Sequence, residues 1–304
     1  MSKKGEPVDG VLLLDKPERM SSNWALQLAR RLLNAEKAGH TGTLDPMATG
    51  LLPLAFGNAT KFSTDLLHAD KTYIATLRFG ARTDTLDKTG EVVSESPVRP
   101  TLEEIKAVIP EFTGTILQRP PMYSAIKREG RNLYELARRG ISVEREAREV
   151  EVKRLTALSF DGEELTFEAA VSKGTYIRVL ADDLAVRLGT YAHLTALRRT
   201  AVGDLRIEDA VSFATLDDKE KTIEDRRALL KGADFLLRSL PDLRLSSTDA
   251  KRLQNGQRLA IGASLRGEAR AYGPENQLLG VVQVDARGVV HPSRLIKFLG
   301  NTEI

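Results

Sequence analysis

Apolar residues recur along the chain with two different periods. The segment GVLLLDKP (residues 10–17) is a short apolar run closed by a Lys-Pro turn, which predicts a buried strand. The segments KTYIATLRFG (71–80) and LTFEAAVSKGTY (165–176) alternate apolar and polar positions, as half-buried strands do. A polar turn, TDTLDKTGEVV (83–93), leads into a further predicted strand.

Three other segments have the period of an amphipathic helix: SSNWALQLARRLLN (21–34), TLEEIKAVIPEFTG (101–114) and YIRVLADDLAVRLG (176–189). Ser22 or Asn23 can cap the first, and Thr101 with Glu104 forms a capping box at the start of the second. The predicted apolar faces contain Trp24, Leu26, Ala29, Leu32 and Leu33 in the first helix, and Ile177, Leu180, Ala181, Leu184 and Leu188 in the third.

The order of these elements predicts the fold class. Strands and helices mix without a regular βαβ rhythm, which favours an α+β protein with a mixed, largely antiparallel central sheet flanked by helices. The polar segment DDKEKTIEDRR (217–227) is typical of a solvated helix face or a connector. After LPDLRLSS (240–247) only short strand patterns follow. We therefore expect two domains, a larger one at residues 1–240 and a small, mostly β domain at 243–304.

Composition narrows the classes of protein that are possible. The chain has 304 residues, a net charge of +3 and a pI near 9.0, and its last part (243–304) carries nine Lys or Arg against five Asp or Glu. Mild basicity suggests a polyanionic partner. The absence of cysteine excludes disulfides and thiolate chemistry. No apolar run has the length of a signal peptide core or a membrane span, so we expect a cytoplasmic protein with no membrane contact.

The stretch GHTGTLDPMATGLLPL (39–54) holds the strongest candidate for chemistry. Asp45 precedes a proline, which favours an extended backbone, and Gly42 and Gly50 permit tight turns on either side. The apolar residues that follow would lower the local dielectric, so the carboxylate would need a cationic partner. The alternative is an ordinary turn aspartate that bonds its own backbone.

Several familiar kinds of site are missing from the sequence. The glycine loop lacks the lysine of a phosphate-binding loop, and no G-x-S-x-G nucleophile elbow occurs. The four histidines, His40, His68, His193 and His291, are not in ligand spacing, and a metal site built from His40 and Asp45 has little support. These residues therefore predict no phosphate-binding loop and no serine nucleophile, and they give little support to a metal site.

Three further features have both a functional and a structural interpretation. Tyr73 can be a core ring or a ring that contacts substrate. Arg178 lies at the start of a predicted helix, where a cation is disfavoured, so it is either a surface arginine or the partner of an anion. The segment QRPPMYSAIKREGRNLYELARRG (118–140) interleaves basic residues with Tyr123 and Tyr134, which suits looped RNA but also fits a solvated amphipathic segment.

Five stretches taken in order carry a specific resemblance. GVLLLDKPERMSS (10–22), GHTGTLDPMATGLLPLAFGNATK (39–61), KTYIATLRFGARTDTLDKTGEVV (71–93), QRPPMYSAIKREGRNLYELARRG (118–140) and KGTYIRVLADDLAVRLGTYAHLTALRRT (173–200) resemble the motifs of the TruB family of tRNA pseudouridine synthases. The resemblance is dense from residue 9 to about 215. It extends more thinly to the C-terminal part, which is similar to the small β-barrel RNA-binding domains of the PUA type.

The resemblance implies a function and a site. The family has the pseudouridine synthase fold and converts uridine 55 in the T-loop of tRNA into pseudouridine, by base flipping and without a cofactor, a metal or an obligatory protein partner. Asp45 matches the catalytic aspartate, Arg178 the arginine that pairs with it and keeps it ionised, and Tyr73 the tyrosine that stacks on the flipped base and can accept a proton. Further matching positions are His40, Tyr176 and Leu197, which line the nucleotide pocket, and Lys16, Lys61 and Asp87, which support it, Lys61 as a phosphate contact.

Some alternatives stay open at this point. The aspartate could attack the sugar C1′ or act through a glycal intermediate. A non-catalytic RNA-binding or RNA-folding protein could share the scaffold, but the presence of both Asp45 and Arg178 favours an enzyme. A related synthase that modifies other RNAs with the help of partner proteins is a second alternative. The inserted segment 123–140 favours the stand-alone bacterial type instead.

Overall fold

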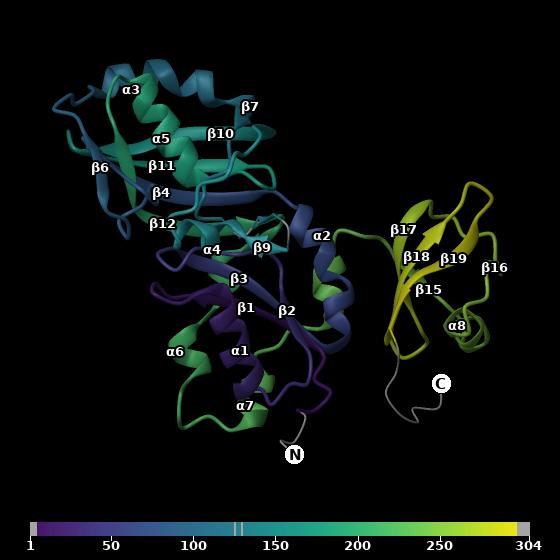
Figure 1. The fold of residues 1–304 in the computed structure, drawn as a ribbon. Helices are drawn as coiled ribbons and strands as arrows, with labels where there is room; N and C mark the ends of the chain where they lie inside the picture. The colour runs from purple at the N-terminus through teal and green to yellow at the C-terminus, as the bar shows by residue number, and fades with distance from the viewer. Residues whose placement is uncertain (1–4, 125, 129, 297–304) are drawn as a thin grey trace.

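The computed structural model describes residues 5–124, 126–128 and 130–296 (Figure 1). Its largest sheet has ten strands in the order β14-β1-β3-β12-β4-β11-β10-β7, with β2 beside β3 and β13 beside β12. The strands are β1 (Gly10–Lys16), β2 (Ala38–His40), β3 (Thr49–Phe56), β4 (Lys71–Phe79), β7 (Gly114–Gln118), β10 (Arg148–Phe160), β11 (Glu164–Val171), β12 (Ala192–Val202), β13 (Leu205–Arg206) and β14 (Val211–Ser212). Only the pairs β1–β14 and β3–β12 are parallel, so the expected mixed, largely antiparallel α+β sheet is confirmed.

Helices cover the sheet in two groups. Figure 1 shows α3 and α5 against the half that contains β4, β10 and β11, and α1, α6 and α7 beside the half that contains β1 and β3. The helices are α1 (Ser22–Leu32), α2 (Ser63–His68), α3 (Leu102–Val108), α4 (Leu133–Ala137), α5 (Ile177–Arg187), α6 (Phe213–Leu216), α7 (Ile223–Arg227) and α8 (Ser247–Gln254), with 3-10 turns at 57–61, 109–112, 207–209 and 233–237. Two small hairpins pair β5 (Ala81–Thr83) with β6 (Val92–Glu95), and β8 (Lys127–Arg128) with β9 (Arg131–Asn132).

The first helix differs in detail from the sequence prediction. Ser21, not Ser22 or Asn23, caps α1, because its side chain accepts a hydrogen bond from Trp24 N at 3.1 Å. Ser22 is instead buried within the helix. Trp24 was predicted on the apolar face but is 56% exposed. In contrast, the capping box of Thr101 and Glu104 is confirmed at α3.

A second sheet follows the ten-stranded sheet along the chain. It has the order β15-β17-β18-β19-β16, and its strands are β15 (Asp242–Arg244), β16 (Leu259–Ala260), β17 (Gly267–Tyr272), β18 (Leu278–Val284) and β19 (Val289–Leu295). The expectation of short strands here is confirmed, but it missed α8, which Ser246 caps by accepting from Asp249 N at 3.2 Å. The division into domains at residues 240 and 243 stays a prediction.

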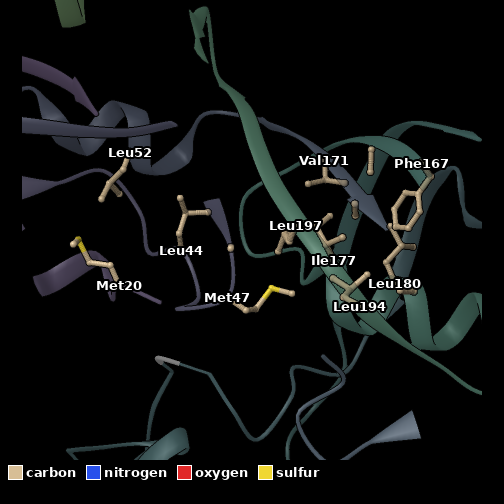
Figure 2. Close-up of a cluster of buried hydrophobic side chains, with 14 of the residues drawn as sticks. Met20, Leu44, Met47, Leu52, Phe167, Val171, Ile177, Leu180, Leu194 and Leu197 are labelled. Carbon is tan, nitrogen blue, oxygen red and sulfur yellow. The ribbon is translucent and has the colours of Figure 1, made fainter. Parts of the chain in front are cut away.

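The core reaches the loop that contains Asp45. Figure 2 shows Leu44 and Met47, which flank Asp45 in sequence, within a cluster of buried apolar side chains that also contains Leu52 of β3 and Leu197 of β12. Burial of apolar side chains on both sides of the aspartate gives this loop a fixed place in the core. Within the described residues, no helix is long and apolar enough to cross a membrane.

Candidate active site

Asp45 lies in the loop that joins β2 to β3, and this loop is held at several points. Gly42 (φ +128°) and Gly50 (φ +105°) adopt backbone conformations that other residues rarely reach. The buried hydroxyl of Ser22 in α1 accepts a hydrogen bond from Leu44 N (2.7 Å) and donates one to Leu44 O (3.0 Å). The glycine-rich stretch is therefore tied to helix α1 directly beside the aspartate.

The carboxylate of Asp45 forms an ion pair with Arg178 at the start of α5. Nε of Arg178 lies 2.8 Å from Oδ2 of Asp45, and the side chain of Arg178 is only 4% exposed against 34% for Asp45. Nη1 of Arg178 donates to Thr85 O (2.7 Å) and Nη2 donates to Tyr123 O (2.7 Å). Because carbonyls from two other loops bind these two nitrogens, Nε is held toward the aspartate.

Asp87 is the second carboxylate near Arg178. Its Oδ2 lies 3.7 Å from Nε of Arg178. Its Oδ1 accepts hydrogen bonds from Thr85 Oγ1 (2.9 Å), Thr89 N (2.9 Å) and Thr89 Oγ1 (2.5 Å). Asp87 is buried and its hydrogen bonds shape the same turn whose Thr85 carbonyl binds Arg178. This arrangement makes Asp87 a support for the arginine.

Burial raises the pKa of Asp45 above its ordinary value. The positive charge of Arg178 opposes this rise in pKa, and the negative charge of Asp87 adds to it. The net result is a carboxyl group that takes up a proton at higher pH than an exposed aspartate. Arg178 therefore limits the cost of ionising Asp45 but does not abolish it.

Asp45 lines a cavity of about 370 Å³, a size within the range of small-ligand sites. The walls come from the aspartate loop, strands β4, β11 and β12, and the start of α5. The cavity brings together five of the residues predicted from the sequence, which are Asp45, Tyr73, Tyr176, Arg178 and Leu197. It also contains residues that the sequence did not indicate, among them Leu67, Lys71, Ile126 and Arg199.

The two tyrosines enter the cavity from different elements. Tyr73 is on β4, the strand between β11 and β12. Tyr176 directly precedes α5, and burial raises the pKa of its hydroxyl. The side chain of Gln118 fixes the backbone of Tyr176, since its Oε1 accepts from Tyr176 N (2.7 Å) and its Nε2 donates to Tyr176 O (3.1 Å). Gln118 was not predicted, because its partner is far away in the sequence.

Lys16 does not line the cavity but lies close to it. Its side chain is fully buried, and Nζ donates to the carbonyls of Pro17 (2.8 Å) and Met20 (2.7 Å). Burial lowers the pKa of Lys16 to about 8, and the negative charge of Asp45 opposes that shift. Lys16 is therefore close enough to Asp45 to affect the ionisation of that carboxyl group. The hydrogen bonds of Lys16 also hold the turn after β1.

His40 and Lys61 also lie outside the lining of the cavity. His40 ends β2, is half-buried, and its Nδ1 accepts a long hydrogen bond from Gly42 N (3.4 Å). Burial lowers its pKa, so the ring is more readily neutral. Nζ of Lys61 donates to Leu295 O in the second sheet (2.8 Å). The structure thus places Lys61 at the junction of the two sheets rather than in the wall of the cavity.

The basic segment 118–140 is described except for residues 125 and 129, and the side chains of Arg128 and Arg131 also lie outside the description. The hydroxyl of Tyr123 donates to Asp84 Oδ2 at 3.0 Å, and the guanidinium of Arg138 lies over the ring of Tyr134 at 5.5 Å. Since Tyr123 O also binds Arg178, this segment is attached to the candidate site by its backbone.

Two cations in the wall of the cavity were not predicted. Nζ of Lys71 donates to three carbonyls at the end of α2 (2.6 to 3.2 Å), and burial lowers its pKa to about 8. Arg199 is almost completely buried in β12. One signal for Arg199 was available, because it shares the face of the strand with Leu197 and Ala201, where an apolar residue is usual.

Within residues 5–124, 126–128 and 130–296, no group of three or more His, Asp or Glu side chains is arranged to hold a metal ion. The two acidic side chains at the site, Asp45 and Asp87, face Arg178. The charged groups here are therefore arranged for ion pairing.

The sheet and the position of the aspartate loop define the class of protein. The chain resembles the crystal structure of an archaeal box H/ACA sRNP Nop10–Cbf5 complex, with a TM-score of 0.70 and 24% identity over 95% of this chain and 86% of that chain. This likeness shows the fold, which is that of the pseudouridine synthases.

Sequence comparisons then identify the family. Three family models match, described as TruB family pseudouridylate synthase (N terminal domain) at residues 30–177, tRNA pseudouridylate synthase B C-terminal domain at 178–238, and Pseudouridine synthase II TruB, C-terminal, at 241–296. Proteins named tRNA pseudouridine synthase B from Dechloromonas aromatica and Burkholderia lata are both 52% identical over 95% of this chain, and over 96% and 90% of their own lengths. The chain belongs to the TruB family of pseudouridine synthases, which are isomerases.

Proposed function

We propose that the protein isomerises uridine 55 in the T-loop of tRNA to pseudouridine. Relatives that are 52% identical over most of both chains are named for tRNA as substrate. The observation that carries the proposal is the ion pair of Asp45 with Arg178 in a cavity that also contains Tyr73. The reaction breaks the bond from C1′ to N1 and forms one from C1′ to C5, while C5 loses a proton and N1 gains one. No electrons enter or leave.

Asp45 acts on the sugar in this proposal. An ionised carboxylate can attack C1′ or remove a proton from the sugar, and both routes break the bond from C1′ to N1 and so detach the uracil from the sugar. Both routes need the carboxylate form, which Arg178 favours against the effect of burial. One third of the Asp45 side chain stays accessible, which leaves the carboxylate open to a bound nucleotide in this proposal.

The other lining residues hold the uracil while it turns. The ring of Tyr73 is available to stack on the base, and its hydroxyl can take up the proton that C5 loses. Tyr176 and Leu197 complete the pocket around the base. A uracil confined between these side chains can rotate and present C5 to C1′ without escaping into solvent.

The uridine must leave the stacked T-loop before it can enter the cavity. His40 ends a strand close to the aspartate loop and can fill the space that the flipped base leaves. Lys61 contacts an RNA phosphate in this proposal, at the junction of the two sheets rather than inside the cavity. Lys16 and Asp87 support the site by fixing the turn after β1 and the position of Arg178.

We also propose that residues 243–304 form a PUA-like domain that binds RNA, and that residues 1–240 form the catalytic domain. Support comes from the compact five-stranded sheet with α8 and from the excess of basic residues there. The enzyme acts on the T-arm without an obligatory protein partner and resides in the cytoplasm in this proposal.

The proposal is tested by incubating the purified protein with unmodified tRNA. Pseudouridine is then mapped by carbodiimide treatment and primer extension. We expect a single strong stop that corresponds to position 55. A stop at another position, or none with folded protein, would contradict the proposed substrate site.

A further inference from the structure

Arg199 is a cation buried in the wall of the cavity. Its side chain, at 1% exposure, is among the largest fully buried ones, and it lines the same cavity as Asp45. Among the described residues, no carboxylate forms an ion pair with it. Its neighbour Arg198 differs, since Arg198 pairs with Asp15 at 2.7 Å and its side chain is 41% exposed. A buried guanidinium is costly, so its position needs another explanation.

The hydrogen bonds of Arg199 reach both ends of the aspartate loop. Nη2 donates to Gly42 O (3.3 Å), three residues before Asp45, and Nε donates to Leu51 O (2.8 Å), six residues after it. The backbone of Arg199 is also in close contact with the loop. A Cβ atom added to Gly50 would lie 2.3 Å from Arg199 O, so only glycine allows β3 to approach β12 this closely.

Arg199 has a second connection to the site through the sheet. β12 lies between β3 and β4, and Arg199 is in register with Gly50 on one side and with Tyr73 on the other. One residue therefore joins the strand that follows the aspartate loop to the strand that carries Tyr73. Burial lowers the pKa of His40 and of Lys16, and the charge of Arg199 adds to both shifts, so Arg199 lies close to both groups.

We propose that Arg199 is a positioning residue for the isomerisation. Its planar guanidinium group binds the two ends of loop 42–51 and so keeps Asp45 in contact with Arg178. A guanidinium can bind two carbonyls in fixed directions, whereas an ammonium is a single point of charge. The shape of the side chain matters more than its charge in this role. The inference rests on the proposed function of the site.

The test compares three variants of the full-length protein on unmodified tRNA under single-turnover conditions. Arg199→Met removes the guanidinium group but keeps an unbranched side chain. Arg199→Lys keeps the positive charge but has no planar group that can bind two carbonyls. Arg154→Met is the control, because Arg154 lies on β10 of the same sheet and pairs with Glu168 rather than with loop 42–51. Rates are expressed per folded molecule, measured by circular dichroism, and the dissociation constant for tRNA is measured separately.

We expect the rate of Arg199→Met to fall about 100-fold, with tRNA binding within threefold of wild type, because the loop and not the RNA surface is altered. Arg199→Lys should stay at least about tenfold slower than wild type, and Arg154→Met should be unchanged. The fall in rate at low pH (the acidic limb of the pH–rate profile) should also move to higher pH in Arg199→Met. A displaced Asp45 loses the nearby positive charge of Arg178, which favours its carboxylate form.

The outcomes separate the inference from the proposed function. If the wild-type protein makes pseudouridine and Arg199→Met reacts within threefold of it, with an unshifted acidic limb, Arg199 is only structural and the inference is wrong. Full activity of Arg199→Lys would also overturn it, since charge alone would then suffice. If the wild-type protein makes no pseudouridine, it is the proposed function that fails.

Discussion

At the scale of single residues, the ionisation of Asp45 controls the proposed reaction. The carboxylate form is the reactive one, and burial raises the pKa of this group. We therefore predict that the single-turnover rate falls as the pH is lowered through the raised pKa of Asp45, at a higher pH than an ordinary aspartate near 3.9 would give. The rate is measured from about pH 4 to 8 while circular dichroism reports the folded fraction. A rate that stays constant down to the ordinary range of aspartate would contradict the role of burial.

Tyr73 allows stacking and proton transfer to be separated. Tyr73→Phe keeps the ring and removes the hydroxyl, and Tyr73→Leu removes both. If the hydroxyl accepts the proton from C5, Phe should lose about 10²–10⁴-fold in turnover with little change in binding. Leu should in addition weaken binding by about 1–3 kcal/mol of stacking.

Single-turnover rates with saturating enzyme decide between the two roles of Tyr73, since product release does not affect them. A Phe variant within threefold of wild type would leave the ring as a stacking surface only. The proton acceptor would then have to be another group, with Asp45 the nearest candidate in the cavity.

At the scale of elements, the close contact of β3 with β12 holds the aspartate loop. We predict that Gly50→Ala lowers the free energy of unfolding and slows the reaction, because its φ of +105° is strained for alanine and its Cβ would lie 2.3 Å from Arg199 O. The backbone strain alone costs about 1–3 kcal/mol, and the steric contact adds to it. Urea denaturation and single-turnover rates measure the two effects.

Gly162 provides the matched control for this prediction. It has a similar φ of +99° in the turn between β10 and β11, but a Cβ there would meet nothing within 4 Å. Gly162→Ala should therefore lose only the strain energy and keep its rate. Equal losses of stability and rate in both variants would show that close packing at Gly50 is unimportant.

Local sequence signals predicted most of these elements. The alternation in 71–80 and the capping box of Thr101 and Glu104 depend on residues a few positions apart, and both are confirmed. The cap of α1 was placed wrongly because three adjacent polar residues can each cap, and only the fold decides that Ser22 binds the aspartate loop. Helix α8 was missed because its segment, STDAKRLQ, has only two buried apolar residues.

The candidate site was predictable only where it is local in sequence. The Asp45 loop is one continuous motif, so its glycines and proline indicated a special carboxylate. Gln118 and Arg199 act through partners that are 58 and 148 positions away, and no spacing rule connects such residues. Lys61 shows that closeness in sequence can also mislead. Its motif lies next to the aspartate loop in sequence, but its ammonium group binds the second sheet.

At the scale of the whole molecule, the second sheet is joined to the first by several kinds of contact. Val281 and Ile296 pack in one apolar cluster with Val11 of β1 and with Phe62, which precedes α2. In addition, Arg294 pairs with Asp65 of α2 at 2.8 Å. Removing this sheet would expose the apolar cluster. Substitutions of surface charge are therefore a better test of its role than truncation.

We predict that replacing the exposed Lys251, Arg258 and Arg287 by Gln weakens tRNA binding without changing the rate at saturation. Each phosphate contact that is lost should reduce the slope of log K against log salt by about 0.7–0.9. Filter binding at several salt concentrations measures that slope, and Lys106→Gln on α3 is the control. An unchanged slope in the triple variant would mean that these residues do not contact RNA.

The most direct test of the whole account is the comparison of wild-type protein with Asp45→Asn on unmodified tRNA. Asparagine has nearly the same shape but cannot act as a carboxylate, so binding should stay within about tenfold, or 1.4 kcal/mol. We predict that carbodiimide mapping detects pseudouridine at position 55 with the wild-type protein and none with Asp45→Asn at equal RNA occupancy. Pseudouridine formation by Asp45→Asn near the wild-type rate would contradict the assignment of Asp45, and with it the mechanism built on its ion pair with Arg178.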